Sequence, residues 1–179
     1  MTGKPQQAPA GAASTLGALS VAAMAVTAFA LVPAVAQDTA PDRSQSAAWH
    51  NEQQAALARL QPADGWGTLP GGLRIRRVKG DGIGPHPTVR DTVTVHYAGT
   101  LTDGTTFDSS WDRGEPATFP LGKLVEAWQL AIPHMAVGDT IEIAVPADLG
   151  YGPRGKGPIP GNATLLFTIE LLAIEGQGR

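Results

Sequence analysis

The chain has 179 residues, of which 42% are apolar and 16% are charged, and this is enough for one globular core with appendages. The formal net charge is −3, and no run of basic residues attracts a phosphate backbone, which argues against nucleic-acid binding. The absence of cysteine excludes disulfides, thiol catalysis and a lipid-modified cysteine. The four histidines lack the spacing of metal ligands, so neither a metal site nor a cofactor is expected.

Residues 16–31 form an uncharged apolar run that follows Lys4 and precedes Ala34-Val35-Ala36. This pattern predicts a signal peptide over residues 1–36, with cleavage after Ala36. The alternative is an uncleaved anchor helix, which the alanine-rich and rather short run disfavours. The mature protein is therefore expected to be exported and soluble, in the periplasm if the source is Gram-negative, and to meet the membrane only transiently.

Residues 37–69 are interpreted as a linker that contains a short amphipathic helix. The helix is predicted over residues 46–60, with Trp49, Ala56 and Leu60 near one face, and Gly65 lies in the segment that stops it. The helix either packs on its own domain or forms an arm that binds a partner or a second copy.

From Leu73 onward, apolar residues alternate with polar ones, which predicts half-buried strands. One short helix is expected around residues 123–131, ended by Pro133. Its apolar stripe consists of Leu121, Leu124, Val125 and Trp128. The predicted fold is α+β, a curved antiparallel sheet wrapped around one short helix.

A hairpin carries the candidate chemistry. Tyr97 lies on the apolar face of its strand, and Asp103-Gly104 favours a tight type I′ turn. The returning strand would bring Phe107 and Asp108 close to Tyr97, giving an apolar wall with a hydroxyl and a carboxylate at its edge.

Residues 148–162 form a long loop rich in glycine and proline, and such loops are usually functional or mobile. Tyr151 and Ile159 within it offer a hydroxyl and an exposed apolar group that could close over a bound segment. A surface connection without a role is the alternative.

These residues together resemble the FKBP-type peptidyl-prolyl cis-trans isomerases. The resemblance covers about residues 73–175 and rests on several motifs in order. They are Val95-His96-Tyr97, Phe107-Asp108-Ser109-Ser110, Phe119-x-Leu121-Gly122-Lys123, Trp128, Met135-x-Val137-Gly138-Asp139, Tyr151-Gly152 and Ile159-Pro160-x-Asn162-Ala163-Thr164-Leu165. It implies a half-barrel around a helix, with an isomerase domain over residues 70–176 and a tail over 177–179.

The resemblance also implies the site residues, divided into two groups. The catalytic residues would be Tyr97, Asp108 and Tyr151, and the substrate-binding residues would be Phe107, Phe119, Val125, Trp128, Ile159 and Phe167. This chain departs from the family pattern at Ala117, where many members have an aromatic residue, at Ala127, and in a slightly shorter flap around Lys156-Gly157-Pro158.

The expected activity is acceleration of Xaa-Pro rotation in unfolded or nascent exported proteins, with no cofactor and no metal. Macrolide inhibitors are further expected ligands of such a pocket. The alternative is a holdase or peptide-binding module. In that case the pocket and the N-terminal helix would bind unfolded chains, and isomerisation would be incidental.

Overall fold

The computed structural model describes residues 43–175, so the predicted signal peptide, its cleavage site and the predicted tail over 177–179 lie outside the described residues. The strands of the described part are β1 (Gly67–Thr68), β2 (Arg74–Lys79), β3 (Thr92–Leu101), β4 (Thr106–Ser109), β5 (Ala117–Pro120), β6 (Thr140–Val145) and β7 (Leu165–Ile174). The α-helices are α1 (Ala47–Ala58), α2 (Ser110–Arg113) and α3 (Glu126–Ala131). Short 3-10 helices are η1 (Arg43–Gln45), η2 (Pro62–Asp64), η3 (Pro70–Gly72), η4 (Leu121–Lys123), η5 (Ile132–His134), η6 (Ala147–Leu149) and η7 (Gly152–Arg154).

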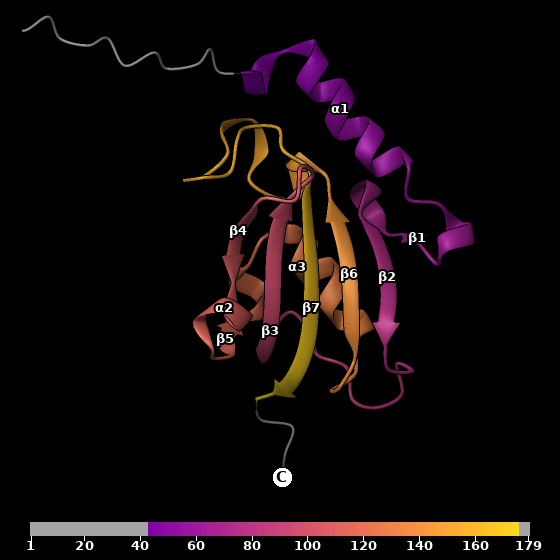
Figure 1. Ribbon diagram of the computed structural model, residues 1–179. Helices are drawn as coiled ribbons and strands as arrows, with labels where there is room; N and C mark the ends of the chain where they lie inside the picture. Colours follow the sequence, from indigo (N-terminus) through magenta and orange to yellow (C-terminus); the bar gives the residue numbers. More distant parts are fainter. Residues whose placement is uncertain (1–42, 176–179) are drawn as a thin grey trace, which may run out of the picture. The chain divides into compact units, whose positions relative to one another are not determined.

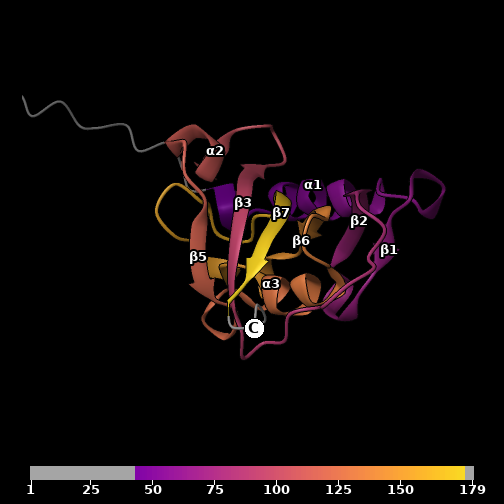
Figure 2. The same ribbon diagram turned by 90° about the horizontal axis from the view of Figure 1, so that it is seen from below.

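The strands form one antiparallel sheet in the order β1-β2-β6-β7-β3-β4, and β5 also pairs with β3. β3 is long enough to pair with β5 through its first half and with β4 through its second half. The sheet curves around α3, as the two views in Figures 1 and 2 show. The predicted α+β architecture, an open curved sheet wrapped around a short helix, is therefore confirmed.

The apolar residues that alternate with polar ones in the sequence are the buried residues of the strands. In β3 every second residue is buried, beginning with Val93, and β7 alternates in the same way over most of its length. The buried faces of β3, β6 and β7 meet α3, where Trp128 is only 4% exposed. Alternation with one buried face is what an antiparallel sheet covered on one side requires.

The central helix begins later than predicted. Residues 121–123 form the 3-10 turn η4, and α3 starts only at Glu126, after Val125 in an extended conformation. The helix ends at Ala131, and Pro133 sits in the first turn of η5, where its missing N–H costs nothing. The predicted range 123–131 was therefore too long at its start, because the apolar stripe continues through the 3-10 turn.

The turn between β3 and β4 differs from the predicted type I′ turn. A type I′ turn needs positive φ at both central residues. Here Gly104 has φ of 88°, whereas Asp103 is not among the residues with positive φ. The Gly104 N–H donates to the Leu101 carbonyl at 3.0 Å, and the Leu101 N–H donates to the Thr105 carbonyl at 2.9 Å. The connection is a longer hairpin loop with glycine in the left-handed position.

The N-terminal segment, which we define as residues 43–58, contains η1 and α1. The Ser46 side chain caps α1 by accepting the Trp49 N–H. The buried residues are Trp49, Gln53 and Leu57. Of the predicted face, Trp49 is buried and Ala56 is half-buried, whereas Leu60 lies beyond the end of the helix, half-buried against Leu57 and Trp66. The helix packs on its own domain, and Trp49 joins the main core. No helix within the described residues is long and apolar enough to cross a membrane.

Asp139 fastens the turn before β6 to the loop after β2. Its side chain is 3% exposed and accepts hydrogen bonds from the Ala136 N–H at 2.8 Å and the Gly82 N–H at 3.3 Å, in addition to a salt bridge with Arg77. Burial by itself raises the pKa of Asp139, but the two N–H donors and Arg77 outweigh it and hold the pKa below its usual 3.8.

Replacing Asp139 by asparagine is expected to destabilise the fold by about 2 kcal/mol at pH 7, because hydrogen bonds to a buried charged group are lost. Since the folded pKa is lowered, the stabilisation is present above the usual pKa and disappears as the pH falls through the folded value. Thermal unfolding of both proteins at pH 7 and at lower pH measures this difference.

Asp148→Asn is the matched control for this substitution, because it makes the same charge change at an exposed position. We expect it to leave the Tm nearly unchanged at pH 7. If the difference in Tm between wild type and Asp139→Asn stayed constant down to about pH 2, this would contradict the electrostatic origin of the effect.

Candidate active site

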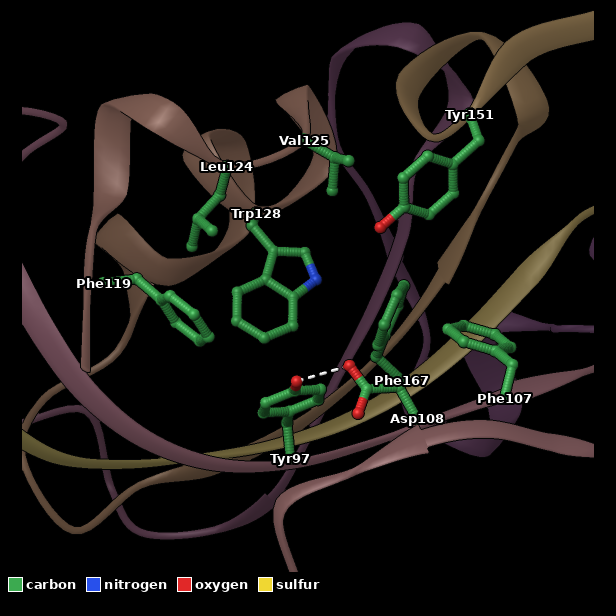
Figure 3. A pocket seen from close by; sticks show the side chains of 9 residues that line it. All are labelled: Tyr97, Phe107, Asp108, Phe119, Leu124, Val125, Trp128, Tyr151 and Phe167. Carbon is green, nitrogen blue, oxygen red and sulfur yellow. Dashed lines mark hydrogen bonds between the residues drawn. The ribbon is translucent and has the colours of Figure 1, made fainter. Parts of the chain in front are cut away.

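A cavity of about 230 Å³ opens between the concave face of the sheet and the start of α3. Figure 3 shows the side chains that line it, which come from five strands and helices and from two connecting segments. They are Tyr97, Phe107, Asp108, Phe119, Leu124, Val125, Trp128, Tyr151 and Phe167. The structure thus brings eight of the nine predicted site residues together and adds Leu124, which the sequence pattern places in the apolar stripe of the helix.

The indole of Trp128 forms the floor of the pocket. Its ring lies edge-on to Tyr97, with centroids 5.2 Å apart, and to Phe167, with centroids 5.4 Å apart. Phe107 in turn stands edge-on to Phe167. The indole Nε1 is buried and has no hydrogen-bond partner among the described residues, and in Figure 3 it faces the open middle of the pocket. The walls are therefore apolar and aromatic, a surface that suits a compact apolar ring.

A β-bulge places both Phe107 and Asp108 at this pocket. Neighbouring residues of a regular strand point to opposite faces of the sheet, so only one of them could line the cavity. In β4, however, Asp108 pairs with Gly99 and Thr106 pairs with Thr100, which leaves Phe107 as the extra residue. The sequence predicted that both side chains lie close to Tyr97, but not the bulge that allows it.

Gly99 explains how the Phe107 ring fits against the sheet. A Cβ atom built on Gly99 would lie 2.5 Å from the Phe107 ring and 2.8 Å from the Phe167 ring. Any larger residue here would push the two rings apart, so this side of the pocket needs glycine.

Tyr97 and Asp108 form the polar edge of the pocket together with Arg113. The Tyr97 hydroxyl donates to Asp108 Oδ2 at 2.5 Å, Arg113 Nη2 donates to the same hydroxyl at 3.1 Å, and Arg113 also forms a salt bridge with Asp108. Sequence reasoning missed Arg113. The Ser109 side chain caps the single turn of α2, and this turn carries Arg113 back towards Asp108.

The protonation states at this edge follow from these contacts. Burial raises the pKa of Asp108, but the hydrogen bonds from Tyr97 and Arg113 outweigh it and hold the pKa below 3.8. Burial and the hydrogen bond to Asp108 raise the pKa of Tyr97 above 10.0, and burial together with the Asp108 charge does the same for Tyr151. At neutral pH Asp108 is therefore a carboxylate, and Tyr97 and Tyr151 are neutral phenols.

The flap, which we define as residues 150–164, covers one side of the pocket with Tyr151. Ile159 was predicted to be exposed, and this is wrong: it is 7% exposed, packs into the core and does not line the cavity. Its N–H donates to the Lys156 carbonyl at 3.0 Å. Lys156 also places its ammonium over the Tyr151 ring, 5.6 Å from the centroid.

Known proteins that are similar to this chain identify its family. The family model for FKBP-type peptidyl-prolyl cis-trans isomerase matches residues 84–172. A peptidyl-prolyl cis-trans isomerase of Schizosaccharomyces pombe is 50% identical over 94 residues, which make up 84% of that protein. The chain belongs to the FKBP-type peptidyl-prolyl cis-trans isomerase family.

Bacterial members of the FKBP family are also similar to this chain. FkpA of Aeromonas hydrophila is 48% identical over 119 residues, which cover 66% of this chain and 44% of that protein. The crystal structure of FkpA from Escherichia coli matches with a TM-score of 0.63 at 37% identity and covers 71% of this chain and 58% of that one. The chain thus spans about half the length of these FkpA proteins.

Among the described residues, no group of acidic or histidine side chains could hold a metal ion.

Proposed function

We propose that this chain accelerates cis-trans rotation about Xaa-Pro bonds. The observation that supports this best is the aromatic pocket with Trp128 as its floor and a single polar edge, Tyr97 and Asp108, beside it. Rotation about a peptide bond faces a barrier of about 18 to 20 kcal/mol, and no covalent bond needs to be made or broken to lower it.

The apolar walls lower this barrier by holding the prolyl ring away from water. The planar amide is polar and resonance-stabilised, so an apolar environment disfavours it relative to the twisted transition state. Trp128, Val125, Phe107 and Phe167 would contact the prolyl ring, while Phe119 closes the far wall. Each 1.36 kcal/mol of differential stabilisation corresponds to a tenfold gain in rate.

The polar edge acts on the carbonyl that turns. Asp108 faces the place where this carbonyl moves out of the amide plane, and Tyr97 and Arg113 keep the carboxylate charged and oriented. The Tyr151 hydroxyl would hold the substrate backbone from the flap. Ile159 would bind substrate through its N–H, which requires that the N–H exchange the Lys156 carbonyl for one of the substrate.

The direct test measures the cis-to-trans rate of an Ala-Leu-Pro-Phe peptide with and without purified residues 37–179. Clear acceleration supports the isomerase. A folded sample without acceleration contradicts it and favours the peptide-binding module instead.

The pH profile provides a second test of the mechanism. Because the pKa of Asp108 is lowered and those of Tyr97 and Tyr151 are raised, none of them changes charge between about pH 5 and pH 9. His96 faces away from the pocket and stacks on Trp111. We therefore expect kcat/KM to stay flat across this range, measured with the same peptide. A bell-shaped profile would instead indicate general acid–base catalysis.

We further propose the cellular setting from the sequence. The signal peptide would cover residues 1–36, the linker with its helix 37–69, the isomerase domain 70–176 and the tail 177–179. The clients would then be unfolded, proline-containing exported proteins, met in the periplasm of a Gram-negative source, and the apolar pocket would also accept macrolide inhibitors. Mass spectrometry of the mature protein tests the predicted cleavage after Ala36, and an intact N-terminus would favour the anchor helix.

A further inference from the structure

The flap has few hydrogen bonds of its own. Lys156 and Ile159 exchange a pair of backbone N–H···O bonds, both at 3.0 Å, and the Asn162 N–H donates to the Gly152 carbonyl at 2.9 Å. Asn162 also adopts a positive φ of 57°. A long connection of this kind pays conformational entropy to stay in one shape, so its order depends on contacts from outside.

The N-terminal segment supplies such contacts from two buried side chains of α1. Trp49 donates its indole N–H to the Gly161 carbonyl at 3.0 Å, and Gln53 accepts the Thr164 N–H at 2.9 Å. Trp49 and Gln53 are 5% and 3% exposed, so these bonds are shielded from water. Both bonds hold residues 161–164, the C-terminal part of the flap, which leads into β7. Figure 1 shows α1 beside the loops before β7.

Ser44 and Gln45 of η1 contact both ends of the flap. In its N-terminal part, the Pro153 carbonyl accepts a hydrogen bond from the Gln45 side chain at 2.9 Å. In its C-terminal part, the Asn162 side chain donates to the Ser44 carbonyl at 2.9 Å and to Gln45 Oε1 at 3.3 Å. Tyr151 lies two residues before Pro153, and Ile159 lies between Pro153 and Gly161, so both residues are next to or between the points that the N-terminal segment contacts.

We infer that the N-terminal segment is a positioning element for substrate binding: Gln45, Trp49 and Gln53 hold the flap in the shape that presents Tyr151 to the peptide. This inference rests on the proposed isomerase function. It gives the helix a role within its own domain, in place of the partner-binding arm considered from the sequence. Residues more than a hundred positions away in the chain would thus set the affinity of the pocket.

The test combines hydrogen exchange with kinetics on two variants of residues 37–179, Trp49→Phe and Gln45→Ala. Trp49→Phe removes the N–H donor but keeps an aromatic ring in the core. Gln45 is exposed, so its truncation leaves the fold intact. Glu52→Ala is the control, because Glu52 is an exposed residue of the same helix. Exchange is followed in peptides from the flap and from β7, and kcat and KM are measured separately.

We expect faster amide exchange in the flap but not in β7 for both variants, and KM about two- to tenfold higher with kcat nearly unchanged, as the loss of one hydrogen bond implies. Simple destabilisation would instead lower the active fraction, and hence the apparent kcat, at constant KM. Glu52→Ala should behave as wild type.

Unchanged flap exchange in both variants would overturn the inference, and so would a loosened flap with unchanged KM. If the wild-type protein itself does not accelerate the peptide, the proposed isomerase fails, while the exchange data still decide whether the N-terminal segment holds the flap. The two failures are therefore distinguishable.

Discussion

Asp108→Ala combined with Tyr97→Phe is expected to lower kcat/KM about 10- to 100-fold on a proline tetrapeptide. The double variant removes the carboxylate that faces the turning carbonyl and the hydroxyl that donates to it at 2.5 Å. A contact that involves a charged group contributes about 1.5 to 3 kcal/mol, and loss of such a contact between Asp108 and the substrate in the transition state corresponds to this range of rates. The measurement is the cis-to-trans rate at several substrate concentrations, with thermal unfolding recorded alongside.

The fold should survive these two changes, because the Tyr97 ring stays in place and Asp108 lies at the pocket edge. Asp112→Ala, at an exposed position of α2, is the matched control and should keep full activity. The single variants should each account for much of the loss, since the two groups share one hydrogen bond and their effects are not additive. Unchanged kinetics in the double variant would remove Asp108 and Tyr97 from the mechanism.

Replacing Trp128 is expected to have the largest effect on the pocket. In Trp128→Ala, the floor that contacts Tyr97 and Phe167 edge-on disappears, and water enters the cavity. If the indole covers about 100 Å² of a prolyl ring, its loss costs about 2.5 kcal/mol of binding to the transition state, or roughly a hundredfold in kcat/KM. The rate must be corrected for the folded fraction, which circular dichroism provides.

Trp128→Leu separates the pocket effect from unfolding. Truncation of a buried tryptophan to alanine destabilises a protein by about 3 to 5 kcal/mol, whereas leucine fills part of the space and limits this loss. Trp111→Leu is the control, because Trp111 lies outside the pocket, stacked on His96, and is 41% exposed. Full activity in Trp128→Leu would mean that the indole is only a core residue.

The strands were predictable because burial on one face of a sheet leaves a direct trace in the sequence. Val93, Val95 and Tyr97 alternate with polar residues and are all buried. The aromatic lining of the site was predictable from the family motifs, although Phe107 stands at a bulge and Tyr151 lies in the flap. Domain bounds and the roles of individual site residues stay predictions.

The parts that were missed depend on local backbone geometry, which side-chain patterns do not encode. The bulge at Phe107 depends on how β4 pairs with β3. The late start of α3 follows from the 3-10 turn before it, and the return of Arg113 to Asp108 follows from the single turn of α2. The buried face of α1 was predicted only in part, because Gln53, a polar residue, lies on it and accepts a hydrogen bond from the Thr164 N–H. Ile159 was misplaced because hydropathy alone does not tell whether a loop residue packs into the core.

The position of β7 has a consequence for how the domain folds. β7 lies between β6 and β3, so the half of the sheet formed by β1, β2 and β6 meets the half formed by β3, β4 and β5 only through the strand that is made after all of them. Neither half can close over α3 before β7 is available, and the pairing of β3 with β7 bridges more than sixty residues of sequence. A chain that emerges from a ribosome therefore cannot complete the sheet until this strand is free. Its assembly is governed by long-range pairing, which makes it slow compared with a helical bundle of similar size.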